Sequence, residues 1–139
     1  MKKIIKSPLF WMLSYTWGSV MTVIGMCIAL VLMCFGNKPY RFHTLVYFTI
    51  GWGWGGINLG PFFIICKDAP LHTKLHESGH AIQNIIFGPL MPFIVGIPSF
   101  IRSRQYASKL RQGLAHTLPP YDSAWYEAQA TDLGYRYFK

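Results

Sequence analysis

Two histidines and a glutamate in one short segment could bind a metal ion and support hydrolysis. The segment His76-Glu77-Ser78-Gly79-His80 fits the pattern H-E-x-x-H. Residues four apart lie on the same face of a helix, so both imidazoles can reach one divalent cation. Glu77 then lies beside that face, where it can serve as the catalytic base. The alternative is a structural helix that carries two interfacial histidines and an acidic side chain.

A third metal ligand must come from elsewhere, because catalytic zinc usually has three protein ligands and one open position. In one class of H-E-x-x-H proteins a histidine follows six residues after the second one, but this chain has Ile86 there. The only other glutamate is Glu127. A helix over residues 125–134 would place it near a face formed by Ala130 and Gly134, whose small size lets a second helix approach closely. We therefore expect Glu127 to dock beside the histidines; the alternative is a solvated helical glutamate.

A peptidase also needs a donor for the oxyanion that forms at the scissile carbonyl. His116 is our first choice for this role. The other candidates are Tyr121, Tyr126 and Arg136. His72 lies one turn before His76 and could also reach a metal, but we interpret it as a surface histidine.

The two segments resemble the gluzincin type of zinc metallopeptidase. They are most similar to the membrane-embedded peptidases of family M48, which include heat-shock and CAAX prenyl proteases. The resemblance covers the motif positions and not the whole chain, which is short for that family. It implies zinc on His76, His80 and Glu127, with Glu77 as the catalytic base.

One motif position departs from this family. After the alanine of E-x-x-A the family has an aspartate that supports a zinc-binding histidine, whereas this chain has Thr131 there and Asp132 one place later. We also suspect a small bacterial membrane family that shares the segments 59–62 and 88–99.

The elements that position these residues begin with the histidine helix. Asp68 is the expected N-cap, with Pro70 in the first turn, and Gly88 and Pro89 should end the helix.

The composition indicates a membrane protein. Of the 139 residues, 52% are hydrophobic and 13% are charged, against about 25% charged in a typical soluble domain. This excludes a disordered chain, a coiled coil and an ordinary soluble globule. The net charge is +8, but the basic residues flank apolar segments and form no single stripe. An anionic bilayer is therefore a better partner than nucleic acid.

Two uncharged runs are long enough to span a bilayer, which takes roughly 20 helical residues. Residues 9–35 predict a retained transmembrane helix. Residues 44–66 favour a second, kinked span; in the alternative, the helix ends near Gly51 and residues 57–65 are extended. With two spans, Lys38 and Arg41 lie in the intervening loop and the other eleven basic residues lie on the side of the termini. This pattern predicts an integral protein of the bacterial inner membrane with both termini in the cytoplasm.

A third apolar stretch, residues 85–101, contains three prolines, which makes a regular spanning helix a poor interpretation. If it crossed the bilayer, His76 and Glu127 would lie on opposite sides, so the zinc hypothesis requires a re-entrant or interfacial segment. The basic residues that follow would contact lipid headgroups or form a solvated helix face. They are Arg102, Arg104, Lys109 and Arg111.

The sequence thus predicts a mainly α integral membrane protein. Residues 1–66 would form a transmembrane hairpin, with a possible short strand near 57–65, and residues 67–139 a minimal zinc-binding catalytic region. The favoured function is a Zn²⁺ metallopeptidase that acts on membrane proteins or membrane-proximal peptides. The alternatives are a catalytically degenerate metal-binding homologue that acts through a partner, and an accessory membrane protein with a fortuitous motif.

Overall fold

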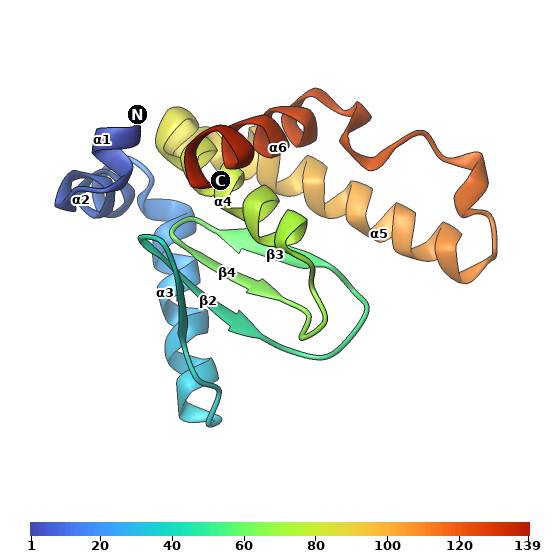
Figure 1. Ribbon diagram of the computed structural model, residues 1–139, viewed down its shortest axis with the longest axis horizontal. Helices are drawn as coiled ribbons and strands as arrows, with labels where there is room; N and C mark the ends of the chain where they lie inside the picture. Colours follow the sequence, from blue (N-terminus) through green and yellow to red (C-terminus); the bar gives the residue numbers. More distant parts are fainter.

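The computed structural model describes residues 1–139 and is mainly helical, with one small sheet. The helices are α1 (Lys2–Ile5), α2 (Pro8–Thr16), α3 (Ser19–Cys34), α4 (Leu71–Phe87), η1 (Gly88–Leu90), η2 (Pro92–Gly96), α5 (Ile97–Arg111), η3 (Ala115–Thr117), η4 (Tyr121–Ser123) and α6 (Trp125–Phe138). The strands are β1 (Tyr40–Phe42), β2 (Leu45–Thr49), β3 (Gly56–Leu59) and β4 (Phe62–Ile65). Helices α4 and α6 lie together over the sheet, and α3 runs beside it (Figure 1).

Residues 44–66 form three strands, so the favoured second membrane span is wrong. The extended segment of the alternative is confirmed, but the helix that it placed before Gly51 is also wrong, because residues Leu45–Thr49 are strand β2. The strand order is β1-β2-β4-β3; β2 and β4 are parallel and the other two pairs are antiparallel. The strands are rich in aromatic and β-branched residues, which suit a pleated sheet. Between them Gly51, Gly53 and Gly55 have positive φ angles of 62°, 64° and 103°, which a continuing α-helix cannot contain.

The first apolar run also differs from its prediction. Residues 9–35 form α2 and α3, whose axes differ by 102°, and not one straight helix. At the break, the side chain of Asn84 in α4 donates to the backbone oxygen of Gly18 (3.2 Å). A Cβ at Gly18 would lie only 2.4 Å from that amide nitrogen, so the contact requires glycine. No single helix of the chain is both long and apolar enough to cross a bilayer. Two bent pairs of helical segments meet that requirement together: α2 with α3, and α4–η1 with η2–α5.

The predicted separation of Arg41 from the chain termini is wrong. After α3 the chain returns as β1, and Arg41 lines a small pocket together with Lys6 and Tyr137. The two termini also lie near each other in the fold (Figure 1).

The third apolar stretch changes direction, as the zinc hypothesis requires. Helix α4 ends at Phe87, and the axis turns by 119° between the α4–η1 and η2–α5 segments. The start of α4 differs from its prediction: Pro70 occupies the N-cap position, and Asp68 instead accepts a hydrogen bond from the backbone nitrogen of Gly53 (2.9 Å).

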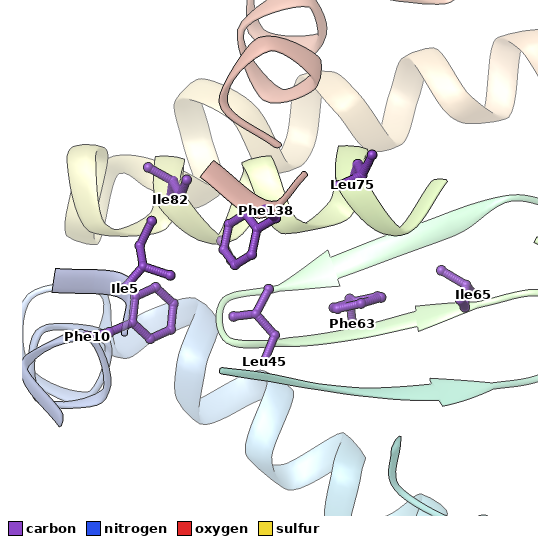
Figure 2. Packing of buried hydrophobic residues seen from close by; sticks show 9 residues of the cluster. Ile5, Phe10, Leu45, Phe63, Ile65, Leu75, Ile82 and Phe138 are labelled. Atoms are coloured by element: carbon purple, nitrogen blue, oxygen red, sulfur yellow. The ribbon is translucent and has the colours of Figure 1, made fainter. Parts of the chain in front are cut away.

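One hydrophobic core joins the two regions that the sequence divided at residue 66. Figure 2 shows side chains of α1, α2 and the sheet packed against those of α4 and α6. The core residues are Ile5, Phe10, Leu45, Phe63, Ile65, Leu75, Ala81, Ile82 and Phe138. The sheet therefore holds α4 in place, and the two regions are a single packing unit.

Candidate metal centre

Three side chains converge at the contact between α4 and α6. His76 Nε2 and His80 Nε2 lie 3.2 Å apart. Glu127 Oε2 lies 3.1 Å from the first and 3.3 Å from the second. Glu127 belongs to α6, so the structure brings together residues that are 47 positions apart in sequence. These three residues could hold a metal ion.

The size of this triangle fits a tetrahedral metal. An ion with bonds of about 2.0 Å and tetrahedral angles separates its ligand atoms by about 3.3 Å. The three edges measured here, 3.1, 3.2 and 3.3 Å, match that separation. A cation placed slightly above the triangle would therefore contact all three atoms without any movement of the backbone.

The carboxylate of Glu127 supports the presence of a cation there. Its side chain is fully buried, and the Nε2 atoms of His76 and His80, which would share the same metal ion, are its close polar partners. A buried carboxylate without a partner is costly, so such groups are normally paired or coordinate a metal. Although burial alone would raise the pKa of Glu127, the adjacent His76 and His80 hold it well below its ordinary value.

Each imidazole is oriented by a hydrogen bond at its other nitrogen. His76 Nδ1 lies 2.9 Å from the Thr131 hydroxyl, and His80 Nδ1 lies 2.7 Å from Gln83 Oε1. The Gln83 amide nitrogen donates to the backbone oxygen of Tyr126 and to Gln129 (both 2.9 Å), so its oxygen must be the acceptor for His80. His80 therefore carries its hydrogen on Nδ1 and presents the Nε2 lone pair to the site, as a metal ligand requires.

Small residues allow α4 and α6 to approach closely enough for this contact. A Cβ at Gly79 would lie 1.8 Å from the backbone oxygen of Ala130. One at Gly134 would lie 1.9 Å from the backbone oxygen of Leu75. The predicted groove formed by Ala130 and Gly134 is thus confirmed, and it is completed by a glycine inside the H-E-x-x-H segment itself.

Glu77 lies beside the three ligand residues and faces the sheet. It is 5% exposed, and a Cβ at Gly56 of β3 would lie 2.6 Å from its Oε1. The side chain of Asn58 donates to the backbone oxygen of Glu77 (2.9 Å), which fixes β3 against α4. Burial raises the pKa of Glu77, although His76 and His80 oppose that shift. The pKa of His80 is also raised: burial lowers it, but the carboxylates of Glu127 and Glu77 outweigh that effect.

A cavity of about 1000 Å³ opens over this group. His76, Glu77 and His80 lie in its wall, whereas Glu127 lies beneath them and does not line it. Strand β3 forms one side of the cavity and helix α5 lines another. The free coordination position of a bound metal would therefore face a space large enough for a peptide segment.

His116, the first choice for an oxyanion donor, is not at this site. It is exposed on η3 and does not line the cavity. Tyr121 does line it, and its ring centroid lies 6.3 Å from that of His76. The guanidinium of Arg102 donates to the backbone oxygen of Tyr121 (2.7 Å) and so attaches η4 to α5. Burial raises the pKa of Tyr121, which keeps the phenol in its protonated, donating form.

His72 lies where the sequence predicted it, whereas Gln83 has a role that the sequence analysis did not predict. His72 is exposed, pairs with Tyr135 (3.0 Å) and is not one of the three metal-site residues. Gln83 was not predicted, although its position three residues after His80 on the same helix face was the available signal.

No family model, curated protein or solved structure matches the chain. The geometry and chemistry of the site are therefore the basis for assigning a function.

Proposed function

We propose that the protein is a membrane-bound zinc metallopeptidase that hydrolyses peptide bonds in membrane proteins or membrane-proximal peptides. The observation that carries this proposal is the arrangement of His76, His80 and Glu127 in a triangle of tetrahedral dimensions. The carboxylate of Glu77 lies beside that triangle, at the wall of the large cavity.

Zinc is the cation that suits these ligands best. Two imidazoles and one carboxylate are a common protein ligand set for catalytic zinc, whereas structural zinc sites are closed by four protein ligands. Calcium and magnesium favour sites made of oxygen atoms alone. His76 and His80 line the cavity and Glu127 lies beneath them, so three ligands would leave one position open toward the cavity, which favours a catalytic role.

The residues around the site can supply the remaining steps of peptide hydrolysis. When bound, zinc acts as a Lewis acid and makes water nucleophilic near neutral pH. The Glu77 carboxylate takes the proton of the attacking water and later transfers it to the leaving amine. The phenol of Tyr121 can donate a hydrogen bond to the carbonyl oxygen as negative charge develops there.

Strand β3 offers a way to hold a peptide in the cavity. It is the last strand of the sheet, and β4 pairs with only one of its sides. Residues 56–59 line the cavity, and Glu77 contacts the start of the strand at Gly56. An extended substrate could hydrogen-bond to the free side of β3 and so present a peptide bond to Glu77.

The surface of α2 and α3 supports attachment to a bilayer. No charged residue occurs from Leu9 to Phe35. Large apolar side chains on both helices are exposed, among them Met12, Val23 and Leu30, which are 58%, 44% and 52% exposed. Exposed large apolar side chains in such number are typical of a membrane-contacting segment. The inner membrane of a bacterium remains our proposed location.

The test uses the full chain, purified in a neutral detergent. Metal content is measured by mass spectrometry, and hydrolysis is measured on unfolded protein and on a library of apolar peptides. We expect one zinc per chain. Glu77→Gln should retain that zinc and lose at least 10²-fold in kcat, whereas Glu127→Gln should lose both zinc and activity. Asp132→Asn removes an exposed carboxylate of the same helix and serves as the matched control.

Each outcome has a distinct meaning. Stoichiometric zinc without hydrolysis in any substrate would replace the peptidase proposal by a metal-binding role. Absence of bound zinc after reconstitution with the metal would contradict the metal centre. Hydrolysis that survives Glu77→Gln would contradict the role of Glu77 as the base.

A further inference from the structure

A second, smaller pocket lies away from the metal centre. It has a volume of about 330 Å³ and shares no lining residue with the large cavity. Its lining residues come from the end of α1, from the β1–β2 hairpin and from the end of α6, close in sequence to the two chain termini. Its lining residues are Ile5, Lys6, Arg41, His43, Thr44 and Tyr137.

The lining of this pocket is basic and rich in donors. Lys6 and Arg41 are cations, His43 offers a ring N–H group, and Thr44 and Tyr137 offer hydroxyls. None of the five acidic residues of the chain lines the pocket. Neither Lys6 nor Arg41 takes part in any of the three ion pairs or five cation–π contacts of the fold. The positive charge in this pocket is therefore not neutralised by the chain.

The side chains of Lys6, Arg41 and His43 are exposed, and the segments that carry them are anchored to the main core by neighbouring apolar residues. Arg41 belongs to β1 and pairs in register with Val46. The ring of His43 packs against that of Phe138, with centroids 5.6 Å apart, and Phe138 is buried in the main core. Tyr137 precedes Phe138 on α6. A ligand would therefore meet donors that the fold has already brought together, which reduces the cost of ordering them on binding.

The hairpin itself contains an unusual residue for its position. His43 is the only non-glycine residue with a positive φ, at 55°. It begins the two-residue turn between Phe42 and Leu45, where glycine or asparagine is favoured. A histidine in this strained position places an imidazole at the pocket, and residues under such strain often occur at ligand sites.

We infer that this pocket binds a phosphate group, either a free phosphate or the headgroup phosphate of an anionic lipid. A guanidinium can bind two phosphate oxygens at once, a lysine adds a point charge, and neighbouring hydroxyls donate to the remaining oxygen. The volume suits a phosphate with a small substituent. Lys6 lies two residues before α2, whose apolar side chains Leu9 and Met12 are exposed, so a lipid could supply the phosphate. The inference does not depend on the proposed peptidase activity.

Binding is tested with the full chain in a neutral detergent. One arm titrates inorganic phosphate by calorimetry, and the other adds phosphatidylglycerol or phosphatidylcholine to the micelles and measures the Tm. Arg41→Gln is expected to weaken binding about tenfold or more, because it removes a charge-assisted contact. Tyr137→Phe should weaken it severalfold while leaving every charge in place. Lys109→Gln removes the same charge from an exposed site on α5 and should change binding by less than twofold.

The two arms identify the source of the phosphate. Saturable binding of inorganic phosphate that is lost in Arg41→Gln supports a site for the free anion. A rise in Tm with phosphatidylglycerol alone, lost in the same variant, supports a headgroup site. No saturable effect in either arm, or equal effects of Arg41→Gln and Lys109→Gln, would overturn the inference. The Tm of each variant without added ligand shows whether the fold is intact.

Discussion

The two imidazoles of the metal centre are oriented by neutral side chains. Thr131 and Gln83 contact the Nδ1 atoms of His76 and His80, and neither carries charge. A carboxylate in such a position increases the basicity of the ligand nitrogen, whereas a hydroxyl or an amide does so less. Glu127 would then be the only anionic ligand of a bound metal. A bound dication would keep a larger share of its positive charge, which strengthens its action as a Lewis acid.

Tyr121 is the residue for which the structure makes the clearest catalytic prediction. Tyr121→Phe keeps the ring beside His76 and the backbone contact with Arg102, and removes only the hydroxyl. Loss of one oxyanion donor typically lowers kcat by about 10²–10³, so we expect that loss with KM and zinc content little changed. Steady-state kinetics with metal analysis measure it.

The matched control is His116→Ala, at the exposed position on η3 that does not line the cavity. It should alter kcat by less than twofold. If His116→Ala lowered kcat and Tyr121→Phe did not, the choice of oxyanion donor would return to the histidine.

Tyr121 and His116 show which part of the site the sequence did not predict, whereas the three candidate metal ligands show which part it did. His76 and His80 were predictable because helical spacing is local, and Glu127 because the chain has no other spare glutamate. Which loop side chain faces the cavity depends on Arg102, which attaches η4 to α5 across nineteen residues. Because Arg102 and Tyr121 are nineteen residues apart in the chain, no local sequence pattern predicts the hydrogen bond between them. The hydrogen bond between His76 Nδ1 and the Thr131 hydroxyl was missed for a different reason. At position 131 the sequence showed only that the aspartate of the M48 pattern is replaced by threonine.

At the level of elements, the contact between α4 and α6 determines whether the metal ligands meet. The predicted small-residue groove on α6 is confirmed, because a short side chain is a local property that the sequence displays directly. The strands at 44–66 were less predictable. An uncharged run of that length satisfies the requirement for a membrane helix and that for buried strands equally well. The positive φ angles of Gly51, Gly53 and Gly55 interrupt a helix, and the segment therefore forms strands instead of a membrane helix.

Gly79→Ala tests the close approach of the two helices. The new Cβ would meet the backbone oxygen of Ala130, which cannot rotate away as a side chain can. We expect the helices to separate, with a loss of about 3 kcal/mol in the free energy of unfolding and weaker zinc binding. Chemical unfolding and zinc titration in detergent measure the two effects.

Gly96→Ala is the control, since its Cβ would meet nothing closer than 3.6 Å, an ordinary van der Waals contact. It should leave zinc binding unchanged. Wild-type stability and zinc affinity in Gly79→Ala would show that the helices need not approach as closely as the structure indicates.

For the whole molecule, the shared core explains how a chain of 139 residues can combine a candidate metal centre with an apolar surface. Side chains from α1, α2 and the sheet pack against α4 and α6, so segments that expose apolar residues also support the two helices that carry the candidate metal ligands. The far part of α3 extends away from this core (Figure 1). Attachment of α3 to a bilayer would then place the metal centre near the membrane without requiring a second span.

Leu30→Lys tests whether α3 enters a bilayer. Leu30 is 52% exposed and lies outside both core clusters, so the substitution should leave the fold and zinc content in detergent unchanged. A lysine within the hydrocarbon layer costs about 3 kcal/mol, which corresponds to a shift of about 100-fold in the membrane-bound ratio. Flotation with liposomes should therefore recover much less of this variant than of the wild type. Gln112→Lys adds the same charge at an exposed turn after α5 and should float normally. A lysine in the hydrocarbon layer should weaken membrane binding. Equal flotation of Leu30→Lys and the wild type would therefore mean that Leu30 of α3 does not enter the bilayer interior.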